Sequence, residues 1–285
     1  MTPRAYLEKQ LSRGGVDLHL HTTVSDGELC REQVVELARD YSLNVFSITD
    51  HDAVDAYHQI PPDGKWLFSG VELDTDAGGG FSPEVLGYGF DVRNPRLVES
   101  LREIQRLRRR RALALMERVN HALEQRGITE PALSRKDLLV PGRATLLKPH
   151  LYRPLVSKGL FRSEDQARRF LNEQVEDVAI AKPSPEEAIE LLHQAGGISV
   201  LAHPGYYDNE VPLAPFVEQL VDAGLDGLEG NYPYFRGNAG FESLEKEQAV
   251  NARVSKLARA HGLLLTRGSD SHTLTHWQIR NTRPF

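Results

Sequence analysis

The stretch GVDLHLHTTVSDGE, residues 15–28, decides the fold of this chain. It starts as a short apolar run, and His19 and His21 stand two residues apart where that run ends. Asp26 follows five residues later. Residues two apart on a β-strand point to the same face, so the two imidazoles are expected to lie side by side. The interpretation depends on whether other parts of the chain repeat this pattern.

Four more apolar runs end in histidine or acidic residues. They are NVFSITDHDA (44–53), KWLFSGVELD (65–74), ISVLAHPG (198–205) and LLLTRGSDSH (263–272). One strand-end histidine or aspartate is most often a buried, solvated or helix-capping residue, but a chance match in all five runs requires five separate coincidences. The candidate metal ligands are therefore His19, His21, Asp26, His51, Glu72, His203, Asp270 and His272.

Amphipathic stretches typical of helices alternate with these runs. They include residues 31–43, 184–197 and 252–262. In the second, Ser184 and Glu187 have the spacing of a capping box. Repeated strand–helix units predict an α/β fold. If the strands are parallel, their carboxyl ends meet on one face of a barrel, which is where such folds place their active sites.

The number and type of candidate ligands predict a multinuclear metal site. Imidazoles mixed with carboxylates suit Mn, Fe or Zn, and we take Mn as the first choice. The side chains outnumber what a single ion requires. We therefore expect two or three divalent cations.

Composition limits the classes of partner. The 285 residues carry 34 Lys and Arg against 40 Asp and Glu, which gives a net charge of −6. Such a chain is not expected to bind nucleic acid duplexes or membranes through bulk charge, although a local basic cleft is compatible with it. The single cysteine, Cys30, excludes an internal disulfide and predicts a cytoplasmic location. Nothing in the sequence indicates the oligomeric state.

The motifs DLHLHTTVSDGE, SITDHDA, GVELD, LAHPG and GSDSH, in this order, resemble those of the PHP family, named after polymerase and histidinol phosphatase. The resemblance covers residues 15–92 and 180–285. It implies a distorted (β/α)7 barrel with a trinuclear metal site and hydrolysis of phosphoesters. It also implies three ligand sets: His19, His21, Glu72 and Asp270 for one cation, Glu72 and His203 for a second, and Asp26, His51 and His272 for a third.

Two positions distinguish this chain from other members of that family. Asp26 replaces the histidine of some relatives and resembles the branch that acts on nucleotides and short nucleic acids. Many relatives also have a histidine just before the LGY-like segment, where this chain has Glu84. Either Glu84 binds the second cation through oxygen, or it is a solvated strand-end charge. In the second case the second site is weak and catalysis itself is in doubt.

Residues 93–179 predict a helical insertion that covers the site as a lid or substrate domain. Its arginine cluster, between Arg106 and Arg111, fits a solvated face paired with acids such as Glu103, or else contacts to a nucleic acid backbone. In GRATLLKPH (142–150) we expect Arg143 and His150 to contact substrate. This segment resembles a Gly-Arg…Pro-His segment of nucleotide-acting relatives, with extra residues between its halves. The alternative is a structural arginine and a helix-start histidine.

The expected function is metal-assisted hydrolysis of phosphate esters of nucleotides, such as nucleoside 3',5'-bisphosphates, or of short oligonucleotides. Bound cations lower the pKa of water and supply hydroxide near neutral pH. We expect His203 or Asp270 to orient the water or to carry protons, and Arg143 to stabilise the charge on phosphate oxygens. Tyr232, Tyr234 and Phe235 either stack on a base or pack within the protein.

Two other functions stay open. One is a small-metabolite phosphatase of the histidinol-phosphatase type, which has little use for the helical insertion. The other is a PHP module with a weakened second metal site that acts in binding. The candidate ligand positions, apart from Glu84, speak against the second alternative.

Overall fold

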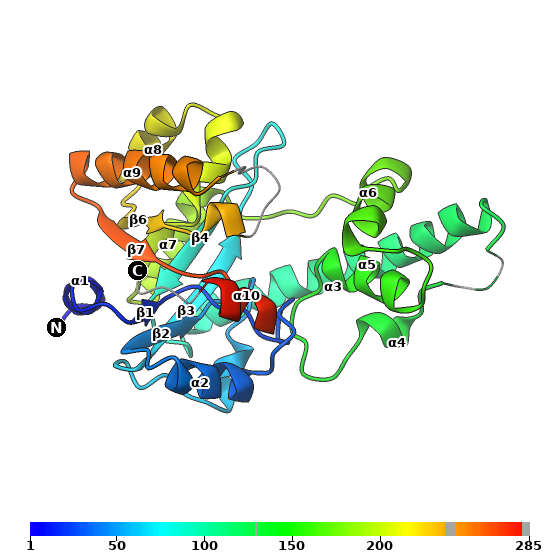
Figure 1. Cartoon of the computed structure of the whole chain (residues 1–285), viewed down its shortest axis with the longest axis horizontal. Coiled ribbons are helices and arrows are strands. Elements are labelled where there is room, and N and C mark those ends of the chain that lie inside the picture. Colours follow the sequence, from blue (N-terminus) through cyan, green and yellow to red (C-terminus); the bar gives the residue numbers. More distant parts are fainter. Residues whose placement is uncertain (129, 131, 237–242, 281–285) are drawn as a thin grey trace.

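Seven strands follow one another in chain order around a nearly closed barrel in the computed structural model, which describes residues 1–128, 130, 132–236 and 243–280 (Figure 1). The main-chain N–H of Leu18 donates to the carbonyl of Arg267 at 3.1 Å, and a parallel bridge joins Leu20 to Ser271, so the first and last strands meet. The predicted distorted (β/α)7 barrel is confirmed. The strands are β1 (Val16–Asp17), β2 (Val45–Ile48), β3 (Leu67–Asp74), β4 (Glu84–Tyr88), β5 (Ile198–Leu201), β6 (Gly227–Asn231) and β7 (Leu264–Arg267).

Strand β4 departs from the expected parallel arrangement. Strands β1 to β3 pair in parallel, as do β5 to β7, but β4 runs antiparallel to both of its neighbours. The reason lies in the connection from β3, where residues 75–83 form a loop in place of a crossover helix, and only antiparallel strands accept so short a link. The first residue of β4, Glu84, consequently pairs with Asp74 at the carboxyl end of β3.

Helices cover the outside of the barrel and bury its apolar residues. The capping box of α7 is present, since Ser184 accepts a hydrogen bond from the main-chain N–H of Glu187 and the Glu187 carboxylate accepts one from that of Ser184. Ile189 and Leu192 of this helix are fully buried in the barrel core. The helices are α1 (Pro3–Leu11), α2 (Arg31–Asp40), α7 (Pro185–Gln194), α8 (Leu213–Asp222), α9 (Leu244–Ala260) and α10 (Leu274–Arg280), with short 3-10 turns at Asp55–His58, Pro204–Asn209 and Tyr234–Arg236.

A helical lobe projects from one side of the barrel (Figure 1). It consists of α3 (Pro95–Glu124), α4 (Arg135–Leu138), α5 (Pro149–Ser157) and α6 (Glu164–Gln174). Leu115, Val119 and Phe170 belong to an apolar core of its own. The 30-residue helix α3 joins the two parts, because Leu97 and Leu101 in its first turns pack in the barrel core. The division into residues 15–92 with 180–285 and an insertion of 93–179 remains a proposal, and residues 281–285 lie outside the described part.

The expectation about the aromatic residues after β6 can be compared with the structure directly. Tyr232 and Tyr234 are buried, which favours packing over stacking on a base, whereas Phe235 is exposed. Within the described residues, the helices are all too short or too polar to cross a bilayer.

Candidate metal centre

All the predicted metal ligands converge at one end of the barrel. They lie just after β1, β2, β5 and β7, within β3, and at the start of β4. Because β4 is reversed, its first residue points to the same end as the last residues of its neighbours. The residues brought together are His19, His21, Asp26, His51, Glu72, Glu84, His203, Asp270 and His272.

The centre of the cluster is formed by His19, His21, Glu72 and Asp270. The Nε2 atoms of His19 and His21 lie 3.2 and 3.3 Å from Oε2 of Glu72. Asp270 Oδ1 lies 3.1 Å from His21 Nε2 and 3.5 Å from His19 Nε2. Two imidazole nitrogens and two carboxylates therefore face a common volume, which is a donor set that transition-metal cations accept.

A second group contains Glu72, Glu84 and His203. His203 Nε2 lies 3.3 Å from Oε1 of Glu72 and 3.1 Å from Oε2 of Glu84. The Glu84 side chain is only 25% exposed and is turned into the cluster, so it is not a solvated strand-end charge. Burial and the neighbouring Glu72 carboxylate raise the pKa of Glu84 above its ordinary value.

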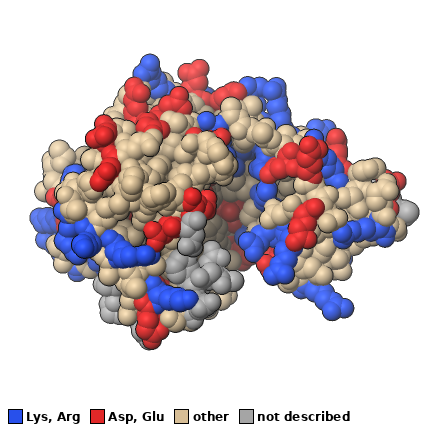
Figure 2. All heavy atoms as spheres, turned by 90° about the horizontal axis from the view of Figure 1, so that it is seen from above, with Lys and Arg blue, Asp and Glu red and all other residues tan. Residues whose placement is uncertain are grey.

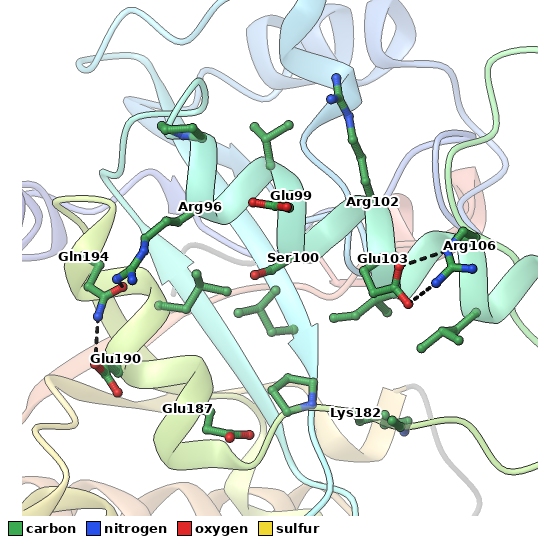
Figure 3. Close-up of a pocket in the computed structure, with 18 of the residues that line it drawn as sticks. Arg96, Glu99, Ser100, Arg102, Glu103, Arg106, Lys182, Glu187, Glu190 and Gln194 are labelled. Atoms are coloured by element: carbon green, nitrogen blue, oxygen red, sulfur yellow. Dashed lines mark hydrogen bonds and ion pairs between the residues drawn. The ribbon is translucent and has the colours of Figure 1, made fainter.

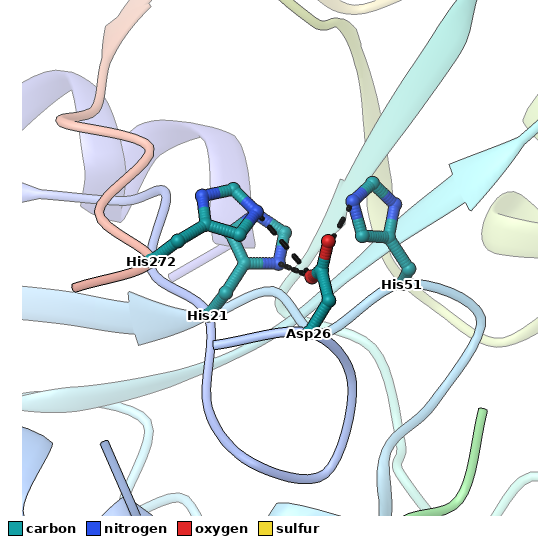
Figure 4. Close-up of side chains that lie close together, drawn as sticks. All are labelled: His21, Asp26, His51 and His272. Atoms are coloured by element: carbon teal, nitrogen blue, oxygen red, sulfur yellow. Dashed lines mark ion pairs between the residues drawn. The ribbon is translucent and has the colours of Figure 1, made fainter. Parts of the chain in front are cut away.

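The third group joins Asp26 to three imidazoles (Figure 4). His272 Nε2 lies 3.3 Å from Asp26 Oδ1, and His51 Nε2 and His21 Nδ1 each lie 3.9 Å from it. A fourth set, His51 with Glu84 and Asp74, adds a carboxylate that sequence reasoning did not include.

The cluster has more ligand atoms than its own hydrogen bonds use. His19 Nε2, both ring nitrogens of His21 and Asp26 Oδ1 are buried, and they meet no partner with hydrogen-bond geometry in the described part of the chain. Burial alone would lower the pKa of His21, but the neighbouring carboxylates of Asp270 and Glu72 raise it to about 9. A metal ion that binds at His21 therefore displaces a proton. The donor set fits divalent cations.

Glu229 is a buried carboxylate next to the ligand cluster that the sequence did not single out. This fully buried residue of β6 places Oε1 3.1 Å from His19 Nδ1, and its Oε2 accepts a hydrogen bond from the main-chain N–H of His203 at 2.9 Å. His203 has a φ of +27°, a conformation that favours glycine, so the bond to Glu229 helps to hold a strained backbone. The segment GLEGN (227–231) also has an acidic residue near the end of a strand, which is the sequence signal for Glu229.

Hydrogen bonds from tyrosines and hydroxyl residues orient the loops of the cluster. The Tyr232 hydroxyl donates to Asp270 Oδ2 at 2.6 Å. Buried Asp50 accepts hydrogen bonds from the hydroxyl groups of Thr22 and Ser25, at 2.7 and 2.6 Å, and so fixes the loop that carries Asp26. These contacts make the site a preorganised one.

The predicted substrate residues Arg143 and His150 lie beside the Asp26 loop. Arg143 donates to the carbonyl of Leu138 at 3.1 Å, and its Nε is buried without a hydrogen bond to the described residues. Burial and nearby Arg153 lower the pKa of Arg143. His150 bonds through Nε2 to the carbonyl of Ser25 at 3.0 Å, while its Nδ1 accepts from a main-chain N–H. Arg153, which the sequence did not single out, donates to the carbonyl of Asp26 at 2.6 Å.

A hollow separates the barrel from the helical lobe, with acidic side chains in its depth and basic side chains on the lobe side (Figure 2). A buried group of imidazoles and carboxylates at the carboxyl end of a (β/α) barrel defines the class of metal-dependent hydrolases.

Comparison with known proteins narrows this class. No model of a protein family matches the sequence. The 5'-3' exoribonuclease Rnm of Escherichia coli is 31% identical over 271 residues, which cover 92% of this chain and 86% of that protein. A phosphoribosyl 1,2-cyclic phosphate 1,2-diphosphodiesterase of Eggerthella lenta is 30% identical, with 90% and 93% covered. A 3',5'-nucleoside bisphosphate phosphatase of Chromobacterium violaceum is 27% identical, with 90% and 87% covered.

Solved structures agree with these relatives. A structure from Chromobacterium violaceum, described as an amidohydrolase with bound sulfate and no metal, has a TM-score of 0.72 at 25% identity and covers 91% of this chain and 88% of that one. One described as a metal-dependent phosphoesterase from Bifidobacterium adolescentis has a TM-score of 0.67 at 26% identity, with 90% and 87% covered. The chain belongs to the PHP family of metal-dependent phosphoesterases. It is accordingly an enzyme that hydrolyses phosphate esters.

Replacing Glu229 by glutamine is expected to weaken binding of Mn²⁺ by about tenfold to a hundredfold, because the neutral amide holds the His19 ring less firmly. Competition with a fluorescent chelator measures this affinity. Glu247→Gln is the matched control, since Glu247 is also buried but lies in α9 and accepts from the main-chain N–H of Phe235. Equal Mn²⁺ affinity in both variants would contradict the role of Glu229.

His150 should contribute to the pH dependence of stability. Burial and nearby Arg143 lower its pKa to about 4, so the unfolded chain, with a pKa of about 6.5, takes up the proton first as the pH falls. The contribution of neutral His150 to the free energy of unfolding is complete above about pH 6.5 and is lost progressively as the pH falls to about 4. This loss amounts to at most about 3 kcal/mol. Metal-free His150→Gln should therefore show a shallower fall of the free energy of unfolding over this range than the parent. Exposed His121→Gln should follow the parent, and parallel curves for all three proteins would refute the expectation.

Proposed function

We propose that this phosphoesterase hydrolyses nucleotides, such as nucleoside 3',5'-bisphosphates, or short oligonucleotides, with two or three divalent cations of which Mn is the first choice and Fe or Zn the alternatives. The observation that carries the proposal is the position of two guanidinium groups, Arg143 and Arg153, next to the Asp26 loop of the ligand cluster. Cations at the ligand cluster, together with these arginines of the lobe, would suit the phosphate groups of such substrates.

The ligand sets follow the groups of side chains described above. His19, His21, Glu72 and Asp270 would hold one cation, Glu72, Glu84 and His203 a second, and Asp26, His51 and His272 a third. Bound cations supply Lewis acidity and a lower pKa for water. The near-complete burial of Glu72 and His21 keeps bulk water from these ligands.

The residues of the chain would then orient the reactants. Water adds to phosphorus while the ester P–O bond breaks, and the leaving oxygen takes up a proton. Asp270, fixed by the Tyr232 hydroxyl, and His203 are the candidates for orienting the water and moving that proton. Arg143 would stabilise charge on the phosphate oxygens. A contact between His150 and substrate remains a prediction and requires one of its two ring hydrogen bonds to break.

The names of the relatives support the substrate class. An exoribonuclease and a nucleoside bisphosphate phosphatase act on RNA and nucleotides, respectively, and both are similar to this chain over most of its length. Arg143 also lines a cavity of about 330 Å³ within the helical lobe, together with Arg109 and residues 138–142. A phosphatase of the histidinol-phosphatase type would have little use for such a lobe.

Mn²⁺-loaded protein is expected to hydrolyse adenosine 3',5'-bisphosphate or short 5'-phosphorylated RNA faster than histidinol phosphate, with release of phosphate or mononucleotide as the readout. Arg143→Ala should raise KM about tenfold or more, since it removes a charged hydrogen bond. Arg168→Ala, an exposed arginine of the same lobe paired with Asp165, should leave KM unchanged. Preference for histidinol phosphate would favour the small-metabolite alternative. No hydrolysis of any phosphate ester, with Mn²⁺ bound, would favour a binding module.

Glu84 should matter for the number of bound cations. Glu84→Ala is expected to lose one Mn²⁺ per chain, or to bind it about tenfold more weakly, as measured by metal analysis after dialysis at fixed free Mn²⁺. Glu84→His, which introduces the imidazole of many relatives, should retain the full number. The control is Glu36→Ala on the exposed face of α2. A full complement of tightly bound Mn²⁺ in Glu84→Ala would show that Glu84 is no ligand.

A further inference from the structure

Helix α3 of the lobe inserts one arginine into the end of the barrel. Arg108 is only 2% exposed. Its Nε donates to Asp52 Oδ2 at 2.7 Å, and its Nη2 lies 2.6 Å from the same oxygen and 2.5 Å from Asp74 Oδ2. For this arginine cluster the sequence left two interpretations open, a solvated face paired with acids or contacts to a nucleic acid backbone. Arg108 is paired with acids, but it is buried and not solvated.

The two carboxylates that Arg108 binds lead directly to a candidate metal ligand. The second oxygen of Asp74, Oδ1, lies 3.0 Å from Nδ1 of His51. With Nδ1–H donated to Asp74, the other ring nitrogen of His51 is the one left to bind a cation, and it faces Asp26. Asp52 Oδ1 also accepts the main-chain N–H of Asp74 at 3.2 Å, so Arg108 fixes Asp74 in two ways.

Helix α3 holds the same region at a second point. Gln105, one turn before Arg108, donates from Nε2 to the carbonyl of Asp52 at 2.9 Å. Asp52 has a φ of +47°, which a non-glycine residue keeps only when its surroundings hold it there. The helix of the lobe therefore fixes both the backbone and the side chain of the residue that follows His51.

The other face of α3 shows what an ordinary surface arginine does in this helix. There the helix borders a groove of about 1370 Å³ against α7, and Arg106 pairs with Glu103 three residues earlier (Figure 3). Both side chains of this pair are half exposed, and neither of them contacts the ligand cluster. Arg106 is therefore a matched control for Arg108 on the same helix.

We infer that Arg108 is a positioning residue of the metal centre, which sets the orientation of His51 through Asp74 and so makes the lobe a structural part of the cation site. This inference rests on the proposed function, because it assumes that His51 binds a cation. The role of a positioning residue differs from a purely structural one. The guanidinium of Arg108 binds two carboxylates at once and fixes their geometry, whereas a single positive charge only balances their negative charge.

The test compares Arg108→Met, Arg108→Lys and Arg106→Met by the number and affinity of bound Mn²⁺, with urea unfolding as the measure of stability. Arg108→Met is expected to bind its weakest Mn²⁺ about tenfold or more less tightly than the parent. Compared with Arg108→Met, Arg108→Lys should recover more of the stability of the parent than of its Mn²⁺ affinity. Arg106→Met should match the parent in both. Unchanged Mn²⁺ affinity in folded Arg108→Met would overturn the inference.

A second readout covers the case in which Arg108→Met does not fold. Arg108→Lys keeps the charge, and its Zn²⁺-loaded form can be studied by long-range proton–nitrogen spectra of the histidine rings. We expect Arg108→Lys to bind Mn²⁺ more weakly than the parent and to show an altered ring signal of His51. An affinity and a ring signal equal to those of the parent would overturn the inference. These measurements need no substrate. If the proposed substrate class is wrong, the parent protein will bind Mn²⁺ normally and will not hydrolyse the nucleotides, and the test of Arg108 is unaffected.

Discussion

The carboxylate of Glu72 is the point on which the rest of the structure depends. Its two oxygens lie 3.2 to 3.3 Å from the ring nitrogens of four histidines, which come from three different strand ends. A buried carboxylate is costly unless it is paired, and so is each buried imidazolium. Either protons or cations must therefore balance these groups, and the barrel is the scaffold that keeps them close while they do so.

The relatives differ in their reported reactions, which range from an exoribonuclease to a bisphosphate phosphatase. These reactions have in common that each of them breaks a phosphate ester. The choice of substrate then depends on what surrounds the cluster. In this chain the surroundings include the helical lobe, whose Arg153 donates to the carbonyl of Asp26 from outside the barrel.

Apolar runs that end in His, Asp or Glu predicted a barrel with ligand-type residues at one end, because such runs are local patterns. The (β/α)7 form and the three ligand sets were implied by the resemblance to the PHP family. The sequence did not predict the direction of β4, because the residue pattern of a strand does not depend on the direction in which the strand runs. The short connection at residues 75–83 is what makes β4 antiparallel to β3. The sequence also missed Glu229 and the burial of Arg108. An acid in a short strand and an arginine within a basic run look like surface residues until the partners, distant in sequence, are known.

The reversed strand also determines how the lobe is attached. Because β4 ends at Tyr88, beside the first residue of β5, the chain leaves this strand at the end of the barrel opposite to the metal centre. Helix α3 must therefore run along the outside of the barrel toward the end that carries the metal centre. It advances about 20 Å between Pro95 and Arg108. A helical segment that follows a parallel strand leaves the barrel at the end that carries the metal centre and can be removed there. Here the first turns of α3 pack in the barrel core. A truncation that leaves the barrel intact therefore has to cut α3 in its middle, beyond Arg108.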